Sequence, residues 1–242
     1  MTLPTGGTIS YAYSGGGAGV NGINCFDGTA ATLQRTTPDT VNNGAPAWQY
    51  THSLSGCSPT SPWCTTITNP TGNVTAMSFQ PVTPTGTTIT YGYETIRTVN
   101  QGTGTLLETV NTCYNGVAPP NCTGSAPAYP FTSVNTYTTL SPWVDEVATT
   151  LNTYGLPTEV DEYGWGNGGR GAMIRKTTTT YASLGNIVDM PYQVTVWDMW
   201  NNVITGQATY YYDQYTQYPL QTTSGNPSTS HHPAARAETP PP

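Results

Sequence analysis

The sequence predicts an all-β protein in which short antiparallel strands form a repeat-built, open sheet ribbon. Only 8% of the 242 residues are charged, against about 25% in ordinary soluble domains. Thr and Tyr are abundant, and they favour a pleated, half-buried surface, whereas the 26 Gly and 21 Pro interrupt it. Two kinds of internal repeat also recur along the chain, which is typical of a fold built from stacked supersecondary units.

The first repeat combines a turn with a strand. The stretches PTGGTISYAY, from Pro4, and PTGTTITYGY, from Pro84, differ at three of ten positions and begin 80 residues apart. Each starts with a Pro-Thr-Gly turn and continues in the alternation of a half-buried strand. One face of the two strands carries, in order, Ile9, Tyr11 and Tyr13, then Ile89, Tyr91 and Tyr93.

The second repeat is a short turn of the form Asp/Asn-x-x-Gly/Asn. It begins at Asn69, Asn152, Ala182, Asp198 and Asp213, imperfectly in the third and fifth copies. An Asp or Asn side chain accepts a hydrogen bond from the backbone two residues on, and Gly or Asn three residues later tolerates a left-handed conformation. The expected structural turn residues are Asn69, Gly72, Asn152, Gly155, Gly185, Asp198, Asn201 and Asp213.

The spacing of these turns defines the expected organisation. The turns that start at residues 152, 182, 198 and 213 are separated by about 15 or about 30 residues. A period near 15 residues accommodates two short strands with their turns. Such a unit is too small to bury its own face, so we expect neighbouring units to stabilise one another edge to edge. This β-sheet region spans residues 1–218, and the Pro/Ser-rich tail over 219–242 lacks the apolar content needed for order.

One segment has two interpretations. The stretch from Ser141 to Gly155 places Pro142 at a helix N1 position and Val144, Val147 and Leu151 on one helical stripe. The same residues suit a strand, and the sequence leaves both readings open.

The cysteines form two close pairs and one remainder, Cys25. Cys57 and Cys64 bracket one Pro-rich loop, and Cys113 and Cys122 bracket another. A disulfide in each pair would stabilise the fold by roughly 2–3 kcal/mol through loop closure. Free thiols within strands are the alternative.

Composition excludes several functions. A net charge of −7 with six Lys and Arg residues argues against nucleic-acid binding. The sequence lacks an apolar run of about 18 residues, which would indicate membrane insertion. Its N-terminus has no signal-peptide pattern. We predict no cofactor, because GNGGRG from Gly166 lies between strand-like segments and not between a strand and a helix. We predict no metal site, because neither cysteine pair has C-x-x-C spacing and the adjacent His231 and His232 lie in the tail. The start of the chain within a strand pattern suggests a fragment of a longer protein.

The best candidates for chemistry are acidic. Alternation places Glu159 and Asp161 on one face near Trp165, with Asp189 or Asp198 as further carboxylates across strands. Glycosidases use two such carboxylates flanked by aromatic platforms, yet acidic residues on the wet face of a sheet are ordinary. Ligand-binding aromatic candidates are Trp143, Trp165, Trp197 and Trp200.

The chain resembles the Rhs/YD-repeat family of large bacterial secreted and surface proteins. The resemblance rests on YYYDQY around Tyr212 and Asp213, on the Asx turns at Asn69 and Asp198, and on the strand PTGTTITYGYE. It implies a β-sheet ribbon that coils into a shell around a C-terminal toxin or effector. Here we find neither a self-cleavage motif nor a folded cargo after Tyr218.

We therefore expect a non-catalytic scaffold segment of a secreted or cell-surface Rhs-like protein, forming the wall of a toxin-encapsulating shell. Its partners would be the rest of that polypeptide or like subunits, joined by edge-strand pairing. One alternative is a carbohydrate-binding or carbohydrate-active secreted β-protein that uses Glu159, Asp161 and the tryptophans. A second alternative is a fibre subunit that self-assembles by strand addition.

Overall fold

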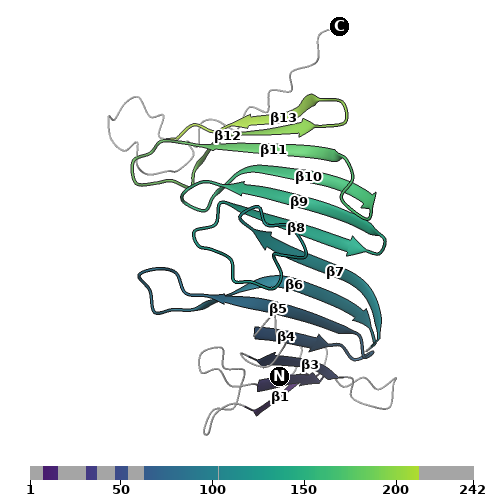
Figure 1. Cartoon of the computed structure of the whole chain (residues 1–242). Helices are drawn as coiled ribbons and strands as arrows, with labels where there is room; N and C mark the ends of the chain where they lie inside the picture. Colours follow the sequence, from purple (N-terminus) through teal and green to yellow (C-terminus); the bar gives the residue numbers. More distant parts are fainter. Residues whose placement is uncertain (1–7, 16–30, 37–46, 54–62, 103, 213–242) are drawn as a thin grey trace. The chain divides into compact units, whose positions relative to one another are not determined.

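The described part of the chain is built from strands alone. A computed structural model describes residues 8–15, 31–36, 47–53, 63–102 and 104–212, and no helix occurs among them. Their thirteen strands form an open sheet whose strand order is the order in the chain (Figure 1). The strands are β1 (Ser10–Gly15), β2 (Ala31–Thr36), β3 (Ala47–Ser53), β4 (Trp63–Thr68), β5 (Val74–Val82), β6 (Tyr91–Gln101), β7 (Thr105–Tyr114), β8 (Ser133–Leu140), β9 (Trp143–Leu151), β10 (Pro157–Asn167), β11 (Met173–Tyr181), β12 (Pro191–Asp198) and β13 (Val203–Thr209).

The all-β, antiparallel prediction is confirmed, and the ambiguous segment after Ser141 is β9. The alternation after the second Pro-Thr-Gly turn predicts a strand that already includes Ile89. β6 begins two residues later, at Tyr91, because Ile89 still belongs to the segment that leads from the turn into the strand. The turn at Pro4 and the tail over 219–242 lie outside the described residues.

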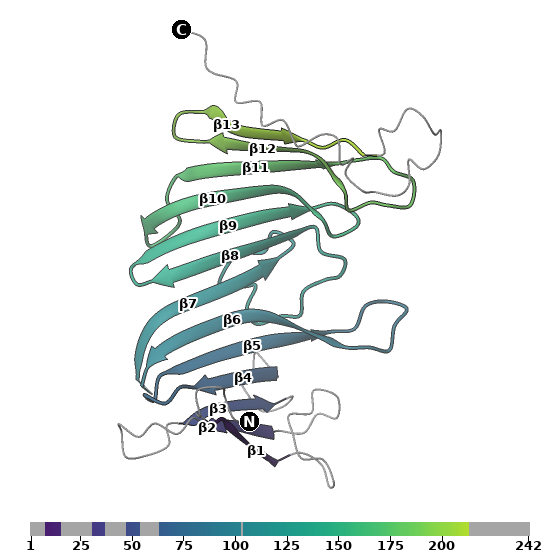
Figure 2. The same cartoon turned by 180° about the vertical axis from the view of Figure 1, so that it is seen from behind.

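The chain divides into two compact units. Unit 1 comprises Met1–Tyr129 with Thr136–Pro142, and unit 2 comprises Pro130–Asn135 with Trp143–Pro242. In unit 2, β9 to β13 follow one another as antiparallel hairpins (Figure 2). The register shifts within each of these pairings, which adds local twist. Among the described residues of unit 2, only Glu146 and Thr195 are buried.

Unit 1 has a small buried region beneath the loop that follows β7. Gln80 Nε2 and Thr95 Oγ1 both donate to the carbonyl oxygen of Thr123, at 3.3 and 3.2 Å, so the loop folds back over β5 and β6 (Figure 1). Thr95 is an extra residue in β6, since Glu94 and Ile96 oppose the adjacent residues Phe79 and Ser78 of β5. The buried residues described in unit 1 are Gln80, Val82, Thr95, Cys113 and Cys122.

A disulfide fastens this loop. Cys113, near the end of β7, bonds Cys122 in the loop, as the sequence predicts. The cross-link spans nine residues, which corresponds to about 2–3 kcal/mol of loop-closure entropy. Cys64 in β4 is also disulfide-bonded, while Cys57 and Cys25 lie outside the described residues.

The turn at Asn152 joins β9 to β10 through its side chain. Asn152 Oδ1 accepts hydrogen bonds from the backbone N–H groups of Tyr154 and Leu156, at 2.9 and 3.0 Å. The backbone closes the turn as well, because Gly155 N–H donates to Asn152 O at 2.9 Å. Gly155 has a φ of 77°, a left-handed conformation that favours glycine.

The turn at Asn69 repeats this arrangement in unit 1. Asn69 Oδ1 accepts from the backbone N–H groups two and four residues later, at 3.0 and 2.9 Å. Gly72 takes the left-handed position, with a φ of 84°. Gly185, in the third copy of the motif, is also left-handed, with a φ of 67°. The short Asx motif therefore takes the same form at two distant points of the chain.

The turn at Asp198 differs in one respect. Asp198 Oδ1 accepts from the backbone N–H groups of Trp200 and Asn201, at 2.9 and 3.3 Å. The left-handed residue, however, is Asn202, with a φ of 52°, and not Asn201. Hydrogen bonds from Asn201 lower the pKa of Asp198. The fifth copy, at Asp213, lies outside the described residues.

We predict that Asn152→Ala lowers the free energy of unfolding by about 1–2 kcal/mol, because two backbone donors lose their acceptor. Asn152→Asp retains the acceptor and should lose less than half of this. Chemical denaturation followed by circular dichroism measures both changes. Thr153→Ala, at a neighbouring turn position, is the control; an equal loss in that variant would contradict a specific role for the Asn152 side chain.

Candidate functional site

Unit 2 gathers charged side chains on one face of its sheet. On β10, Glu159 and Asp161 alternate onto the same side, and Asp161 lies directly opposite Lys176 of β11. Glu146 of β9 occupies the same side, two pairs further along the β9–β10 ladder. We call these four residues, together with Arg170 from the β10–β11 loop, the carboxylate face.

Glu159, Asp161 and Lys176 form a connected group. Lys176 Nζ lies 2.6 Å from Glu159 Oε2, and Asp161 is the residue directly opposite Lys176 in the β10–β11 pairing. Asp161 Oδ1 is shielded from solvent and has no hydrogen-bond partner. Burial raises the pKa of Asp161, and the charge of Glu159 raises it further, against the opposing effects of Lys176 and Arg170. The hydrogen bond to Glu159 is the main cause that raises the pKa of Lys176.

Glu146 is the most deeply buried charge described in the chain, with 1% of its surface exposed. Its Oε1 accepts from Asn135 Nδ2 at 2.7 Å, and its Oε2 accepts from Arg170 Nη1. The Arg170 guanidinium also stacks 3.8 Å from the ring centroid of Tyr163, a cation–π contact. Both carboxylate oxygens are thus paired, which offsets their desolvation.

Ion pairing engages one of the two carboxylates that the glycosidase hypothesis needs. Glycosidases use a pair of carboxyl groups that flank the sugar. Lys176 pairs with Glu159 and neutralises its charge. Asp189 lies in an exposed loop after β11, and Asp198 opposes Arg175 on the other side of the sheet. The carboxylate face is therefore an ion-pair network.

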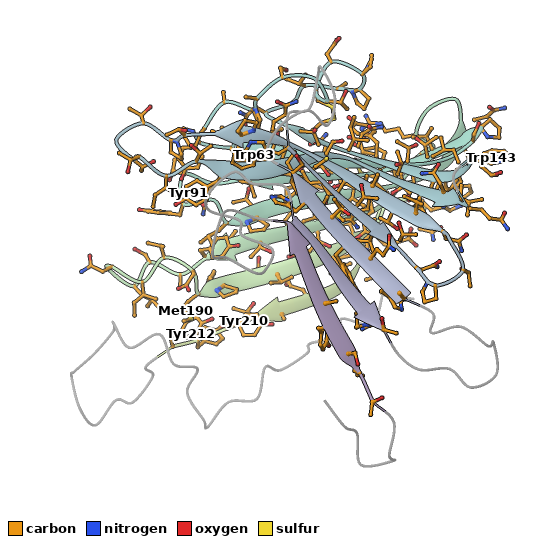
Figure 3. All side chains as sticks on the ribbon, turned by 90° about the horizontal axis from the view of Figure 1, so that it is seen from below. Trp63, Tyr91, Trp143, Met190, Tyr210 and Tyr212 are labelled. Atoms are coloured by element: carbon orange, nitrogen blue, oxygen red, sulfur yellow. A yellow bond between two sulfur atoms is a disulfide. The ribbon has the colours of Figure 1, made fainter. Side chains whose placement is uncertain are left out.

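The four candidate tryptophans lie towards one end of the unit 2 strands. Trp143 begins β9, Trp165 lies near the end of β10, Trp197 near the end of β12, and Trp200 in the following turn. Trp143, Trp165 and Trp200 are 50%, 46% and 80% exposed, whereas Trp197 is half-buried. Figure 3 shows Trp143 projecting outward. Alternation places Trp143 and Trp197 on opposite faces, so the four do not form one platform.

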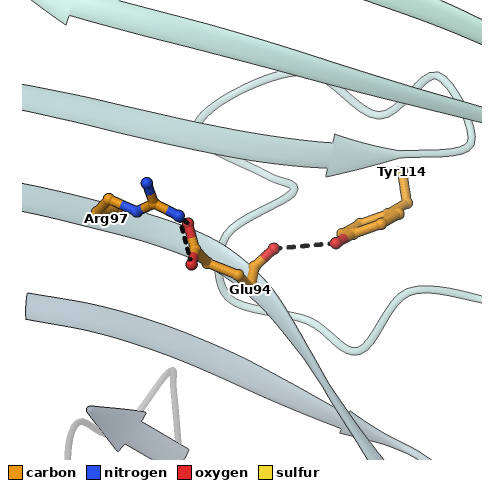
Figure 4. Close-up of polar contacts among 3 residues, drawn as sticks. All are labelled: Glu94, Arg97 and Tyr114. Carbon is orange, nitrogen blue, oxygen red and sulfur yellow. Dashed lines mark hydrogen bonds and ion pairs between the residues drawn. The ribbon is translucent and has the colours of Figure 1, made fainter.

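Unit 1 contains a tyrosine cluster beside the disulfide-closed loop. The rings of Tyr93 and Tyr114 meet edge to face, with centroids 5.9 Å apart. Tyr114 Oη donates to the Glu94 carbonyl at 3.1 Å, while the Glu94 carboxylate pairs with Arg97 at 3.0 Å (Figure 4). Burial, followed by the charges of Glu94 and Tyr93, raises the pKa of Tyr114 to about 12.

In unit 2, each of two hairpins is closed by a tyrosine hydroxyl that donates a hydrogen bond to a backbone carbonyl. Tyr181 at the end of β11 donates to the carbonyl of Pro157, the first residue of β10, at 2.7 Å. Tyr212, just after β13, donates to the carbonyl of Pro191, the first residue of β12, also at 2.7 Å. Figure 3 labels Tyr212 at this end of the strands. Each bond ties the end of a hairpin to its start.

Comparisons with known proteins identify no relative. No protein-family model matches the chain, and neither a curated protein nor a solved structure matches it. Within the described ranges, no helix is long and apolar enough to cross a membrane. The same residues contain no group of three or more His, Cys, Asp or Glu side chains that could hold a metal ion.

We predict that spectrophotometric titration of the folded chain resolves one phenol near pH 12, and that Tyr114→Phe abolishes this step. A raised folded pKa favours the protonated phenol, so the associated stability is present below the ordinary value of 10.0 and is lost as pH rises through about 12. Tyr154→Phe, at a 66% exposed position, is the control. If the step near pH 12 survives in Tyr114→Phe, the assignment is wrong.

Proposed function

We propose that this chain is a non-catalytic structural segment of a larger secreted or cell-surface protein of the Rhs/YD-repeat type. In this role it would form part of the wall of a β-sheet shell that encloses a toxin. The observation that carries the proposal is a sheet whose strands follow chain order from one hairpin to the next. Such a sheet lengthens by adding hairpins and gives each one a neighbour.

The distribution of buried residues supports a wall and not an enzyme. An active site requires a concave, water-excluding setting for its catalytic groups. In unit 2 the described side chains, apart from Glu146 and Thr195, are half-buried or exposed on a single-layer sheet. The carboxylates most suited to chemistry are engaged with Lys176 and Arg170.

The proposed partner is a further strand, either from the rest of the polypeptide or from a like subunit. β13 is the last strand of the described sheet, and its sequence VITGQAT has neither a charge nor a proline. Charges and prolines are common devices that block pairing at an edge. The β13 edge therefore suits strand addition, and this also keeps the fibre-subunit alternative open.

Carbohydrate binding is the second candidate function. The exposed tryptophans Trp143, Trp165 and Trp200 favour it, because flat aromatic rings stack on sugars. Their placement argues for separate contacts and against a single binding platform. Binding of this kind would be compatible with a structural segment on a cell surface.

The scaffold proposal predicts no glycoside hydrolysis by the chain. Wild type, Glu159→Gln and Asp161→Asn should all give background rates on a panel of polysaccharides, since Glu159 is engaged in an ion pair with Lys176. A glycan array with wild type and Trp143→Ala tests the second candidate. Turnover that falls in either carboxylate variant would overturn the scaffold proposal; glycan binding lost in Trp143→Ala would favour the second candidate.

A further inference from the structure

Arg35 on β2 differs from the other cations of the described sheet. Each of those cations pairs with a glutamate; they are Arg97, Arg170, Arg175 and Lys176. No ion pair between residues that the structure describes includes Arg35. Its Nε atom is shielded from solvent and has no hydrogen-bond partner. A shielded donor without an acceptor is unfavourable, so Arg35 is a cation for which the described sheet supplies no anion.

The surroundings of Arg35 are aromatic. Arg35 lies directly opposite Tyr11 of β1 and Trp48 of β3, within the first three strands of the described sheet (Figure 2). Directly opposed residues of antiparallel strands share a face of the sheet. The guanidinium carbon lies 5.2 Å from the centroid of the Trp48 ring, in a cation–π contact. We call these three residues, together with Tyr50, the arginine–aromatic face.

Tyr50 extends the aromatic surface along β3. It follows Trp48 by two residues, so the two side chains lie on the same side of the strand. Their rings are nearly parallel, with an interplanar angle of 16° and centroids 6.4 Å apart. Tyr11 is 49% exposed, and the other three side chains of the arginine–aromatic face are half-buried. Part of each of these side chains therefore reaches solvent.

The charge of Arg35 is not balanced by neighbouring strands. The strands β1 to β5 contain neither Asp nor Glu, and Arg35 is their one Lys or Arg residue. The whole chain has a net charge of −7, so this stretch of sheet departs from the acidic character of the molecule. The arginine–aromatic face thus combines a single uncompensated cation with apolar rings.

A guanidinium that contacts an aromatic ring keeps its hydrogen-bond donors available. The cation–π contact uses the flat face of the group, whereas the N–H bonds lie in its plane. That planar fork matches a carboxylate, which accepts two parallel hydrogen bonds from it. Sugar rings pack on aromatic side chains, and a uronic acid carries a carboxylate on the sugar ring. One uronate unit therefore complements both parts of the arginine–aromatic face.

We propose that the arginine–aromatic face binds an acidic polysaccharide built from uronic acids. The carboxylate of one uronate accepts hydrogen bonds from Nε and one terminal nitrogen of Arg35. This contact requires a change of the Arg35 rotamer and gives the shielded Nε donor its acceptor. Sugar rings of the same polymer pack against Tyr11 and Tyr50. A nucleic acid is disfavoured, because β1 to β5 supply no second Lys or Arg to neutralise phosphates.

This site is separate from the tryptophans of the second candidate function. Trp143, Trp165 and Trp200 belong to unit 2, whereas β1 to β3 belong to unit 1. The inference does not rest on the scaffold function either, because it depends on the side chains of three strands. Its failure would leave the scaffold proposal unchanged.

The first test compares polymers that differ in charge. Isothermal titration calorimetry with the full chain, in the absence of divalent cations, measures binding of polygalacturonate, alginate and fully methyl-esterified polygalacturonate. Esterification keeps the sugar rings and removes the carboxylate charge. We expect the ester to bind about tenfold or more weakly than polygalacturonate, and rising ionic strength to weaken the binding of polygalacturonate. Equal affinity for polygalacturonate and its ester, or no binding of polygalacturonate and alginate, would overturn the proposal.

Variants of the chain test the assignment to Arg35. Arg35→Gln and Trp48→Ala should each weaken polygalacturonate binding about tenfold, and Arg35→Lys, which keeps the charge but loses the planar fork, should weaken it less. Arg97→Gln removes an arginine that already pairs with Glu94 and is the matched control, with wild-type affinity expected. Circular dichroism checks that each variant folds. Unchanged binding in Arg35→Gln would overturn the proposal, as would an equal loss in Arg97→Gln, or a loss in Trp143→Ala, which would assign the binding to unit 2.

Discussion

Backbone hydrogen bonding between neighbouring strands is the interaction on which the described structure depends. Among the described residues of unit 2, no second layer covers either face of β9 to β13, and only two side chains are buried. A single hairpin is marginal in water at best, and it becomes stable only when its edges pair with other strands. The turns, the tyrosine bonds and the ion pairs all serve to hold each strand in the register that this pairing requires.

Polar side chains reinforce that register where an apolar core would do so in a globular domain. Gln193 bonds Thr209 and Gln207 bonds Thr195 between β12 and β13, at 3.3 and 3.1 Å. Such cross-strand pairs each contribute modestly, in the range of about 0.2–1 kcal/mol. The abundance of Thr thus suits a sheet whose described faces in unit 2 are half-exposed.

Local features could be read from the sequence because local physics determines them. The Asx turns at Asn69 and Asn152 depend on a side chain and a backbone a few residues apart, and the loop between Cys113 and Cys122 is closed by residues nine positions apart. Glu146 escaped notice because its partner Arg170 lies 24 residues away and meets it only once β9 and β10 are paired. The hydrogen bonds from tyrosine hydroxyls to Pro157 and Pro191 join residues 24 and 21 positions apart, so they are equally non-local.

Native-state hydrogen exchange of the backbone amides in unit 2 tests this dependence on strand pairing most directly. The account predicts the slowest exchange in β10 and β11, which pair on both edges, and the fastest in β13, irrespective of side-chain burial. Equal protection across β10 to β13, lost in one cooperative step, would contradict it and indicate stabilisation by a common core.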